Sequence, residues 1–104
     1  MKSLGKSAVP RQMLAELEKV GEDIRYARIR RKFTMGDLSK RSGISRSTLD
    51  KVEKGSPSVA IGIYARVLFL LGITGTIRQL ADLSNDPISR DIEIEKLPRR
   101  VKKK

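Results

Sequence analysis

Two short helices with clear end signals, separated by a glycine turn, constrain the fold of this sequence more than any other feature. The first helix follows Thr34, whose hydroxyl can cap its amino terminus. Phe33 before this cap and Leu38 four residues after it form a hydrophobic staple pair. Gly43 then fits the left-handed conformation that stops a helix. Together these signals predict a short helix between Thr34 and Gly43.

The same pattern of signals repeats directly afterwards. Ser45 can cap a second short helix, Ile44 and Leu49 form its staple pair, and Gly55 ends it. A glycine-containing turn of a few residues between two such helices is typical of a helix-turn-helix. Generic helical hairpins share this spacing, so the exposed side of the second helix must distinguish the two.

The outward side of this second helix is polar and mostly basic. Leu49 and Val52 point inward, three residues apart, which turns the following side chains outward: Arg46, Ser47, Asp50, Lys51 and Lys54. A recognition helix enters the major groove of DNA with its N-terminal residues nearest the base edges. We therefore predict that Arg46, Ser47 and Lys51 read bases, with Arg46 suited to guanine O6 and N7.

Contacts with the DNA backbone are predicted from short hydroxyl side chains at the start of this helix. Ser45 and Thr48 carry such hydroxyls, and free amides at a helix N-terminus attract phosphate oxygens. Lys54 adds positive charge. Each residue taken alone is explained equally well as a helix cap or as part of a solvated charged face. Taken together, the residues favour a DNA-binding surface.

The segment before these two helices is also helical in pattern. Apolar residues recur at three- and four-residue steps between Pro10 and Arg31, namely Met13, Leu17, Val20, Ile24 and Ala27. Gly21 interrupts this stripe and costs about 1 kcal/mol relative to alanine in a helix interior. The segment is therefore either one helix or two helices that meet at Gly21.

Two further helices are predicted after Gly55, which makes the fold class all-α. One opens at Ser58 and ends at Gly72, with a buried stripe made of Val59, Ile63, Val67 and Leu71. The other is a short fifth helix over Thr76–Leu83. Tyr64, Leu68 and Leu70 leave more apolar surface than one stripe needs, which favours a homodimer.

The helical spacing stops at Asp86 and Pro87. Charged and apolar residues then alternate over Asp91–Glu95, which indicates a strand, but a lone strand is not stable. This segment is either paired across a dimer or an extended arm. The last residues, 97–104, form a basic tail that could lie along phosphates.

The charge and the composition of the chain limit which classes of function are possible. The net charge is +11, of which +7 falls within residues 25–54 and +5 within residues 99–104, a distribution that suits a polyanionic partner. The chain has no Cys and no His, so we expect no metal site, no cofactor and no enzyme activity. No apolar run is long enough to cross a bilayer, and we expect a cytoplasmic protein without a membrane partner.

The sequence also shows a resemblance to a known protein family. The stretch 21–72 resembles the Cro and lambda repressor type of helix-turn-helix, the xenobiotic response element family. The matching positions are Arg28, Phe33, Thr34, Leu38, Gly43, Ser45–Thr48, Leu49, Val52, Glu53, Gly55, Pro57, Ser58, Leu71 and Gly72. The resemblance implies a five-helix domain in which Thr34–Ser42 is the second helix and Ser45–Lys54 is the recognition helix.

The resemblance also implies roles for individual residues. Arg28 is expected to pair with Glu53 near a phosphate, which makes Glu53 a structural brace. The predicted phosphate-contacting residues are then Arg28, Thr34, Ser45, Thr48, Lys54, Ser56 and Ser58. One position departs from the family, because Met35 stands where a DNA-contacting Gln usually follows the capping Thr. Met35 either packs on sugar or a thymine methyl, or makes no DNA contact.

In its small size and its Pro-Arg-Arg ending, this chain also resembles the antitoxins that pair with HipA-type kinase toxins. This resemblance implies an autoregulated toxin-antitoxin operon and a toxin partner beside the DNA operator. The alternatives are a self-contained repressor and a protein-interaction adaptor with the same fold; RNA binding and enzyme activity have less support. We predict an N-terminal extension over 1–20, a DNA-binding domain over 21–84, and a C-terminal arm over 85–104.

Overall fold

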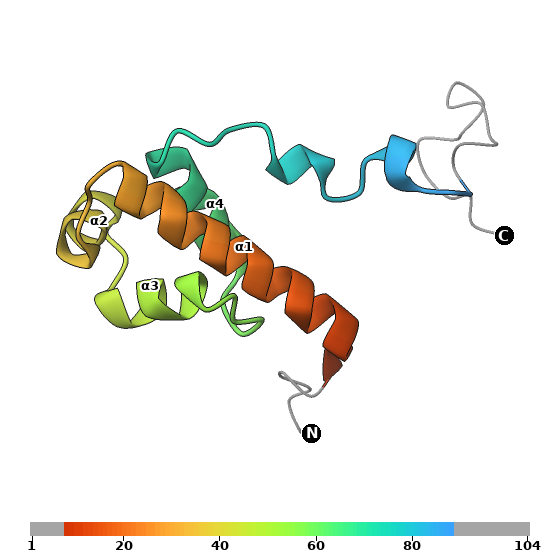
Figure 1. The fold of residues 1–104 in the computed structure, drawn as a ribbon, viewed down its shortest axis with the longest axis horizontal. Coiled ribbons are helices and arrows are strands. Elements are labelled where there is room, and N and C mark those ends of the chain that lie inside the picture. Colours follow the sequence, from red (N-terminus) through yellow and green to blue (C-terminus); the bar gives the residue numbers. More distant parts are fainter. Residues whose placement is uncertain (1–7, 89–104) are drawn as a thin grey trace, which may run out of the picture. The chain divides into compact units, whose positions relative to one another are not determined.

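The computed structural model of the chain describes residues 8–88, and its regular structure is helical (Figure 1). In chain order the helices are α1 (Arg11–Arg30), α2 (Met35–Ser42), α3 (Arg46–Glu53) and α4 (Ile61–Leu70). The predicted all-α fold is confirmed. The alternating segment 91–95 and the basic tail lie outside the described residues.

The chain divides into two compact units, Met1–Thr74 and Gly75–Lys104. All four α-helices belong to the first unit. The described part of the second contains two short 3-10 turns, Ile77–Gln79 and Leu83–Asn85. The boundaries predicted after residues 20 and 84 stay predictions, although α1 runs through the first of them without a break.

The end signals of α2 and α3 operate as their sequence predicts. The Thr34 hydroxyl accepts the Asp37 N–H at 2.9 Å, and the Ser45 hydroxyl accepts the Thr48 N–H at 3.2 Å. Gly43 ends α2 in the left-handed conformation, with φ of 72°. Since the caps fix where each helix begins and ends, they also fix which residues of α3 face outward.

One hydrophobic core holds the four helices together. Its buried members come from every helix and from the α2–α3 turn: Ile24, Leu38, Ile44, Leu49, Val52, Tyr64, Val67 and Leu71. Both staple pairs contribute, because Phe33 packs against this core and Leu38, Ile44 and Leu49 lie inside it. Tyr64, which the sequence placed on a surface left for a dimer, is buried here, so that expectation was wrong for Tyr64.

The structure resolves the open question about Gly21, because α1 is a single helix. Gly21 is buried against the end of α3, where a β-carbon would lie 2.5 Å from the Gly55 nitrogen and 2.7 Å from the Glu53 carbonyl oxygen. The glycine is therefore a close-approach position and no break in the helix. The predicted stripe was wrong at Met13 and Val20, which are 48% and 39% exposed.

Two predicted helix limits also differ from the structure. Helix α4 begins at Ile61 and not at Ser58, because the Ser58 hydroxyl hydrogen-bonds with the Ser56 hydroxyl at 2.8 Å and caps no helix. The fifth helix over Thr76–Leu83 was wrong. The chain makes only 3-10 turns there, and Asp82 accepts the Ser84 N–H, a local bond that competes with a continuous helix.

The contact at Gly21 can be tested by a single added methyl group. Gly21→Ala should lower the free energy of unfolding by about 1 to 3 kcal/mol, because the backbone of α3 must shift. This loss opposes the roughly 1 kcal/mol that alanine normally adds to a helix interior. Gly62→Ala on α4 is the matched control, because its β-carbon meets nothing within 4 Å. Urea unfolding should show opposite signs for the two variants; stabilisation by both would contradict the close approach.

Candidate nucleic-acid interface

The three predicted base readers lie on the solvent side of α3. Arg46 and Ser47 occupy the first turn of the helix, Lys51 follows one turn later, and all three are exposed. The structure adds an ion pair on the same side, with the Lys54 ammonium 3.0 Å from the Asp50 carboxylate. Lys54 therefore presents less free positive charge than its sequence position indicates.

The hydroxyls at the start of α3 form a directed chain. The Ser45 Oγ accepts the Thr48 N–H and donates its own hydrogen to the Thr48 Oγ1 at 3.0 Å. This arrangement uses both the acceptor and the donor of Ser45 inside the protein. The hydrogen of the Thr48 hydroxyl is then the one that can point toward an acceptor outside.

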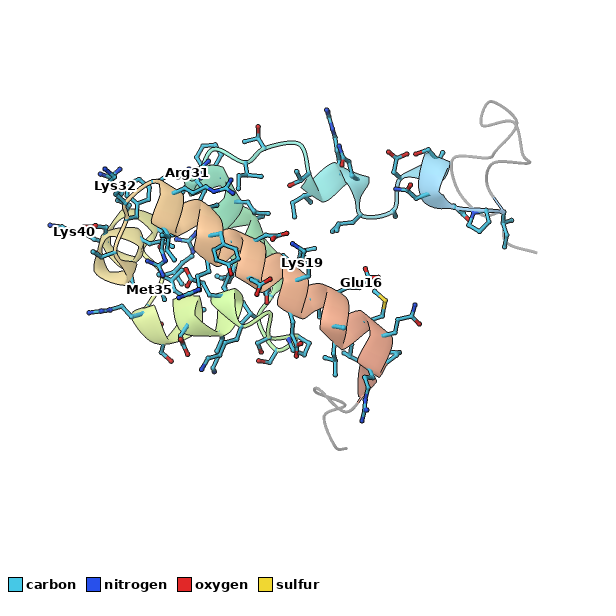
Figure 2. All side chains as sticks on the ribbon, viewed as in Figure 1. Glu16, Lys19, Arg31, Lys32, Met35 and Lys40 are labelled. Atoms are coloured by element: carbon cyan, nitrogen blue, oxygen red, sulfur yellow. The ribbon has the colours of Figure 1, made fainter. Side chains whose placement is uncertain are left out.

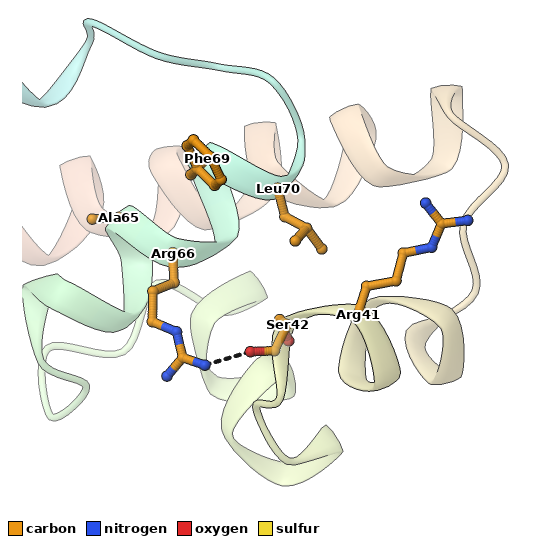
Figure 3. Close-up of a pocket in the computed structure, with 6 residues that line it drawn as sticks. All are labelled: Arg41, Ser42, Ala65, Arg66, Phe69 and Leu70. Carbon is orange, nitrogen blue, oxygen red and sulfur yellow. Dashed lines mark hydrogen bonds between the residues drawn. The ribbon is translucent and has the colours of Figure 1, made fainter.

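The turn between α2 and α3 is held by side chains that the sequence analysis did not identify. The Ser39 hydroxyl donates to the Ile44 carbonyl at 2.6 Å, and the Ile44 N–H donates to the Ser42 hydroxyl at 3.1 Å. From α4, the Arg66 guanidinium donates to the Ser42 carbonyl (Figure 3). These bonds satisfy the turn's polar groups and fix the angle between the two helices.

A buried ion pair fixes α3 against α1. The Arg28 Nε donates to the Glu53 Oε2 at 2.6 Å, and a second bond joins the Arg28 Nη2 to Oε1 at 3.2 Å. The Arg28 Nη1 also donates to the Phe33 carbonyl at 2.9 Å. The two side chains are only 13% and 8% exposed. Arg28 thus joins α1, the turn after it and α3.

The segment after α3 carries two more predicted phosphate contacts, Ser56 and Ser58. Their hydroxyls are bonded to each other, and the Ser58 N–H donates to the Ser56 hydroxyl at 3.2 Å. The Tyr64 hydroxyl anchors this turn by donating to the Ser56 carbonyl at 2.7 Å, and burial raises the pKa of Tyr64. The turn is therefore tied to α4 as well as to α3.

A groove of about 500 Å³ brings several of these residues together. Its walls come from α1, α3 and the following turn, namely Leu14, Glu18, Asp50, Lys51, Lys54, Gly55, Ser56, Pro57 and Ser58. Four predicted DNA-contacting residues are among them. Glu18 and Asp50 add two carboxylates, which makes the surface around Lys51 and Lys54 less basic than the sequence count indicates.

The start of α2 carries a capping box. The Thr34 N–H donates to the Asp37 Oδ2 at 2.9 Å while the Asp37 N–H donates to the Thr34 hydroxyl. These bonds hold the pKa of Asp37 below its ordinary value, the backbone bond from Thr34 being the largest cause. The spacing of Thr34 and Asp37 could have revealed this box in the sequence.

Met35 next to this cap packs partly against the protein core (Figure 2). Its side chain is half-buried among the protein's own apolar groups. This packing gives Met35 a structural role that neither sequence expectation included.

Further basic residues gather at the end of the domain formed by α2 and the turn before it. Figure 2 shows Arg31, Lys32 and Lys40 at this end, and all three are exposed. Arg41 on α2 lies over the ring of Phe33, 4.7 Å from its centre, and so supports the same turn.

Comparison with known families agrees with this geometry. A helix-turn-helix family model matches residues 24–74, just under half of the chain. This segment is similar to a helix-turn-helix. The match supports a DNA-binding transcription regulator, and its limits enclose α2, α3 and α4 entirely. No curated protein matches the chain. None of the helices in residues 8–88 is long and apolar enough to span a membrane.

The ion pair between Arg28 and Glu53 should contribute strongly to the stability of the fold. Glu53→Ala leaves the Arg28 guanidinium buried without its carboxylate, so we expect a loss of about 3 kcal/mol in unfolding free energy. Asp50→Ala on the same helix is the control, because its pair with Lys54 is exposed and should contribute less than about 1 kcal/mol. Chemical denaturation measures both, and equal losses would contradict the brace.

The capping box of α2 predicts a dependence of stability on pH. Because the folded-state pKa of Asp37 is lowered, its stabilising effect is present above the ordinary value of 3.8 and is lost as pH falls through the folded-state pKa. Asp37→Asn should therefore differ most from the parent chain near neutral pH and least in strong acid. Urea midpoints measured between these limits test this; a constant difference would contradict it.

Proposed function

We propose that the chain is a sequence-specific transcriptional repressor whose α3 reads base edges in the major groove of operator DNA. The observation that carries this proposal is the exposure of Arg46 and Ser47 on the first turn of a helix that is fixed at both ends. Such a rigid presentation suits base readout, because the donors of Arg46 need a defined position to meet guanine O6 and N7.

In this proposal, hydroxyl groups and backbone amides around α2 and α3 contact the DNA phosphates. Thr48 is favoured over Ser45, because the Ser45 hydroxyl already donates within the protein. Thr34 stands at the N-terminus of α2, and Ser56 and Ser58 stand after α3. Lys54 contributes charge only where a phosphate competes with Asp50 for its ammonium.

Arg28 takes a different role here from the phosphate contact expected at first. Three of its N–H groups are bonded to Glu53 and Phe33, and its side chain is 13% exposed. We assign it to the brace of α3 together with Glu53. Loss of Arg28 would then act on the orientation of the recognition helix.

The proposed operator consists of two inverted half-sites bound by two copies of the chain. Proteins of this type read DNA with one helix each, so twofold symmetry doubles the length of sequence that is recognised. The net charge of +11 brings each copy to DNA and makes binding depend on salt.

A finer proposal concerns a protein partner, a HipA-like kinase toxin for which the chain would be the antitoxin. It depends on the resemblance stated above. One observation favours a protein partner of some kind: α1 starts at Arg11, well before the family match begins, and exposes Met13 and Val20 on this extension. Co-purification with the product of a neighbouring kinase-like gene tests it, and a monocistronic gene would favour a self-contained repressor.

The base-reading role has a direct test. Selection from random duplexes at stated salt identifies the preferred sequence, and Arg46→Ala should then lose about 1 to 3 kcal/mol on it and relax one base position. Removal of residues 99–104 is the contrasting variant, because it takes away five basic side chains and should weaken binding to all DNA. Equal losses of Arg46→Ala on selected and random DNA would contradict base reading.

A further inference from the structure

A hollow of about 280 Å³ lies between the end of α2 and the second half of α4, and it shares no residue with the groove beside α3. Its lining consists of Arg41, Ser42, Ala65, Arg66, Phe69 and Leu70 (Figure 3). None of these residues belongs to α3. This hollow can therefore be occupied while the outward side of α3 stays exposed.

The two arginines of the hollow have no carboxylate partner in the described range 8–88. Arg66 donates one Nη2 hydrogen to the Ser42 carbonyl, and Arg41 lies over the ring of Phe33. Neither forms an ion pair within that range, and both residues are exposed. A guanidinium carries five N–H donors in a planar fork, so each arginine still offers donors that suit a carboxylate.

The centre of the hollow is apolar. Figure 3 shows Leu70 between Arg66 on one side and Arg41 on the other, with Phe69 next to Leu70 on α4. Phe69 is 73% exposed, so the described part of the chain leaves most of this residue in contact with water. Covering a phenylalanine removes roughly 150 to 250 Å² of apolar surface from water. A partner that reaches Phe69 therefore gains affinity that charge alone does not provide.

Size and composition distinguish between the possible partners of this hollow. Pockets for separate small molecules usually measure about 300 to 1,000 Å³ and enclose most of the ligand, and this hollow is smaller. A DNA backbone supplies anions but no apolar side chain to cover Phe69 and Leu70. A protein segment with acidic and apolar side chains matches both parts of the lining. The same end of the domain adds positive charge that attracts an acidic segment, from the exposed residues Arg31, Lys32 and Lys40.

We propose that the hollow binds a segment of another protein in which acidic side chains flank a large apolar one. The apolar side chain packs on Leu70 and Phe69, and the carboxylates bind Arg66 on one side and Arg41 on the other. The chain then has a protein-binding surface that is separate from the outward side of α3. This inference does not depend on sequence-specific recognition of DNA.

Selection of short random peptides on the whole chain at physiological salt tests the proposal. Enriched sequences should combine a large apolar residue with acidic residues, and fluorescence anisotropy of one labelled enriched peptide then measures its affinity. Phe69→Ser should weaken this binding about tenfold through lost apolar contact. Arg41→Gln should weaken it about threefold through a lost exposed ion pair. Lys40→Gln is the matched control, because it removes the same charge from the neighbouring position of α2 and does not line the hollow.

Several outcomes would overturn this assignment. Equal losses in Arg41→Gln and Lys40→Gln would show that net charge alone attracts the peptides. Enriched peptides without an apolar residue, or unchanged affinity in Phe69→Ser, would also contradict it. Because Phe69 and Arg41 are exposed, both variants should unfold at nearly the temperature of the parent chain.

DNA is the alternative occupant, and the same variants distinguish it. Weaker binding of Phe69→Ser and Arg41→Gln to random duplexes, with unchanged peptide binding, would assign the hollow to DNA and overturn the proposal. The proposed function is tested separately by selection of duplexes. If that selection yields no preferred sequence, the proposed function fails, and the peptide measurements still decide the role of the hollow.

Discussion

The close approach of α1 to the end of α3 is the contact on which the orientation of α3 depends. Gly21 has no side chain, so the backbone at Glu53 and Gly55 can lie directly against α1. Two turns further along α1, Arg28 binds the Glu53 carboxylate. An eight-residue helix held by a backbone contact and by a bidentate ion pair has little freedom to rotate or slide. The direction in which Arg46 points is therefore set by α1.

Local signals in the sequence predicted the limits of α2 and α3 because capping depends on residues only a few positions apart. Thr34, Ser45 and Gly43 each satisfy neighbouring backbone groups, so their roles can be read without a structure. The Arg66 bond to Ser42 joins residues 24 positions apart, and nothing in the local pattern indicates it. The sequence of α1 indicates only that Gly21 lowers helix stability. Its benefit, a close approach to the backbone of α3, depends on the position of a second helix, which the local sequence does not give.

The direction of the hydrogen bond between Ser45 and Thr48 distinguishes the roles of these two residues at the candidate site. Ser45 and Thr48 are equivalent in sequence, but in the structure Ser45 donates inward and Thr48 keeps a hydrogen for an outside acceptor. Met35 packs on the core, so the start of α2 offers less to DNA than the family pattern implies. Every buried side-chain nitrogen and oxygen in the described part of the chain has a partner. In the proposed function, base recognition therefore depends mainly on α3.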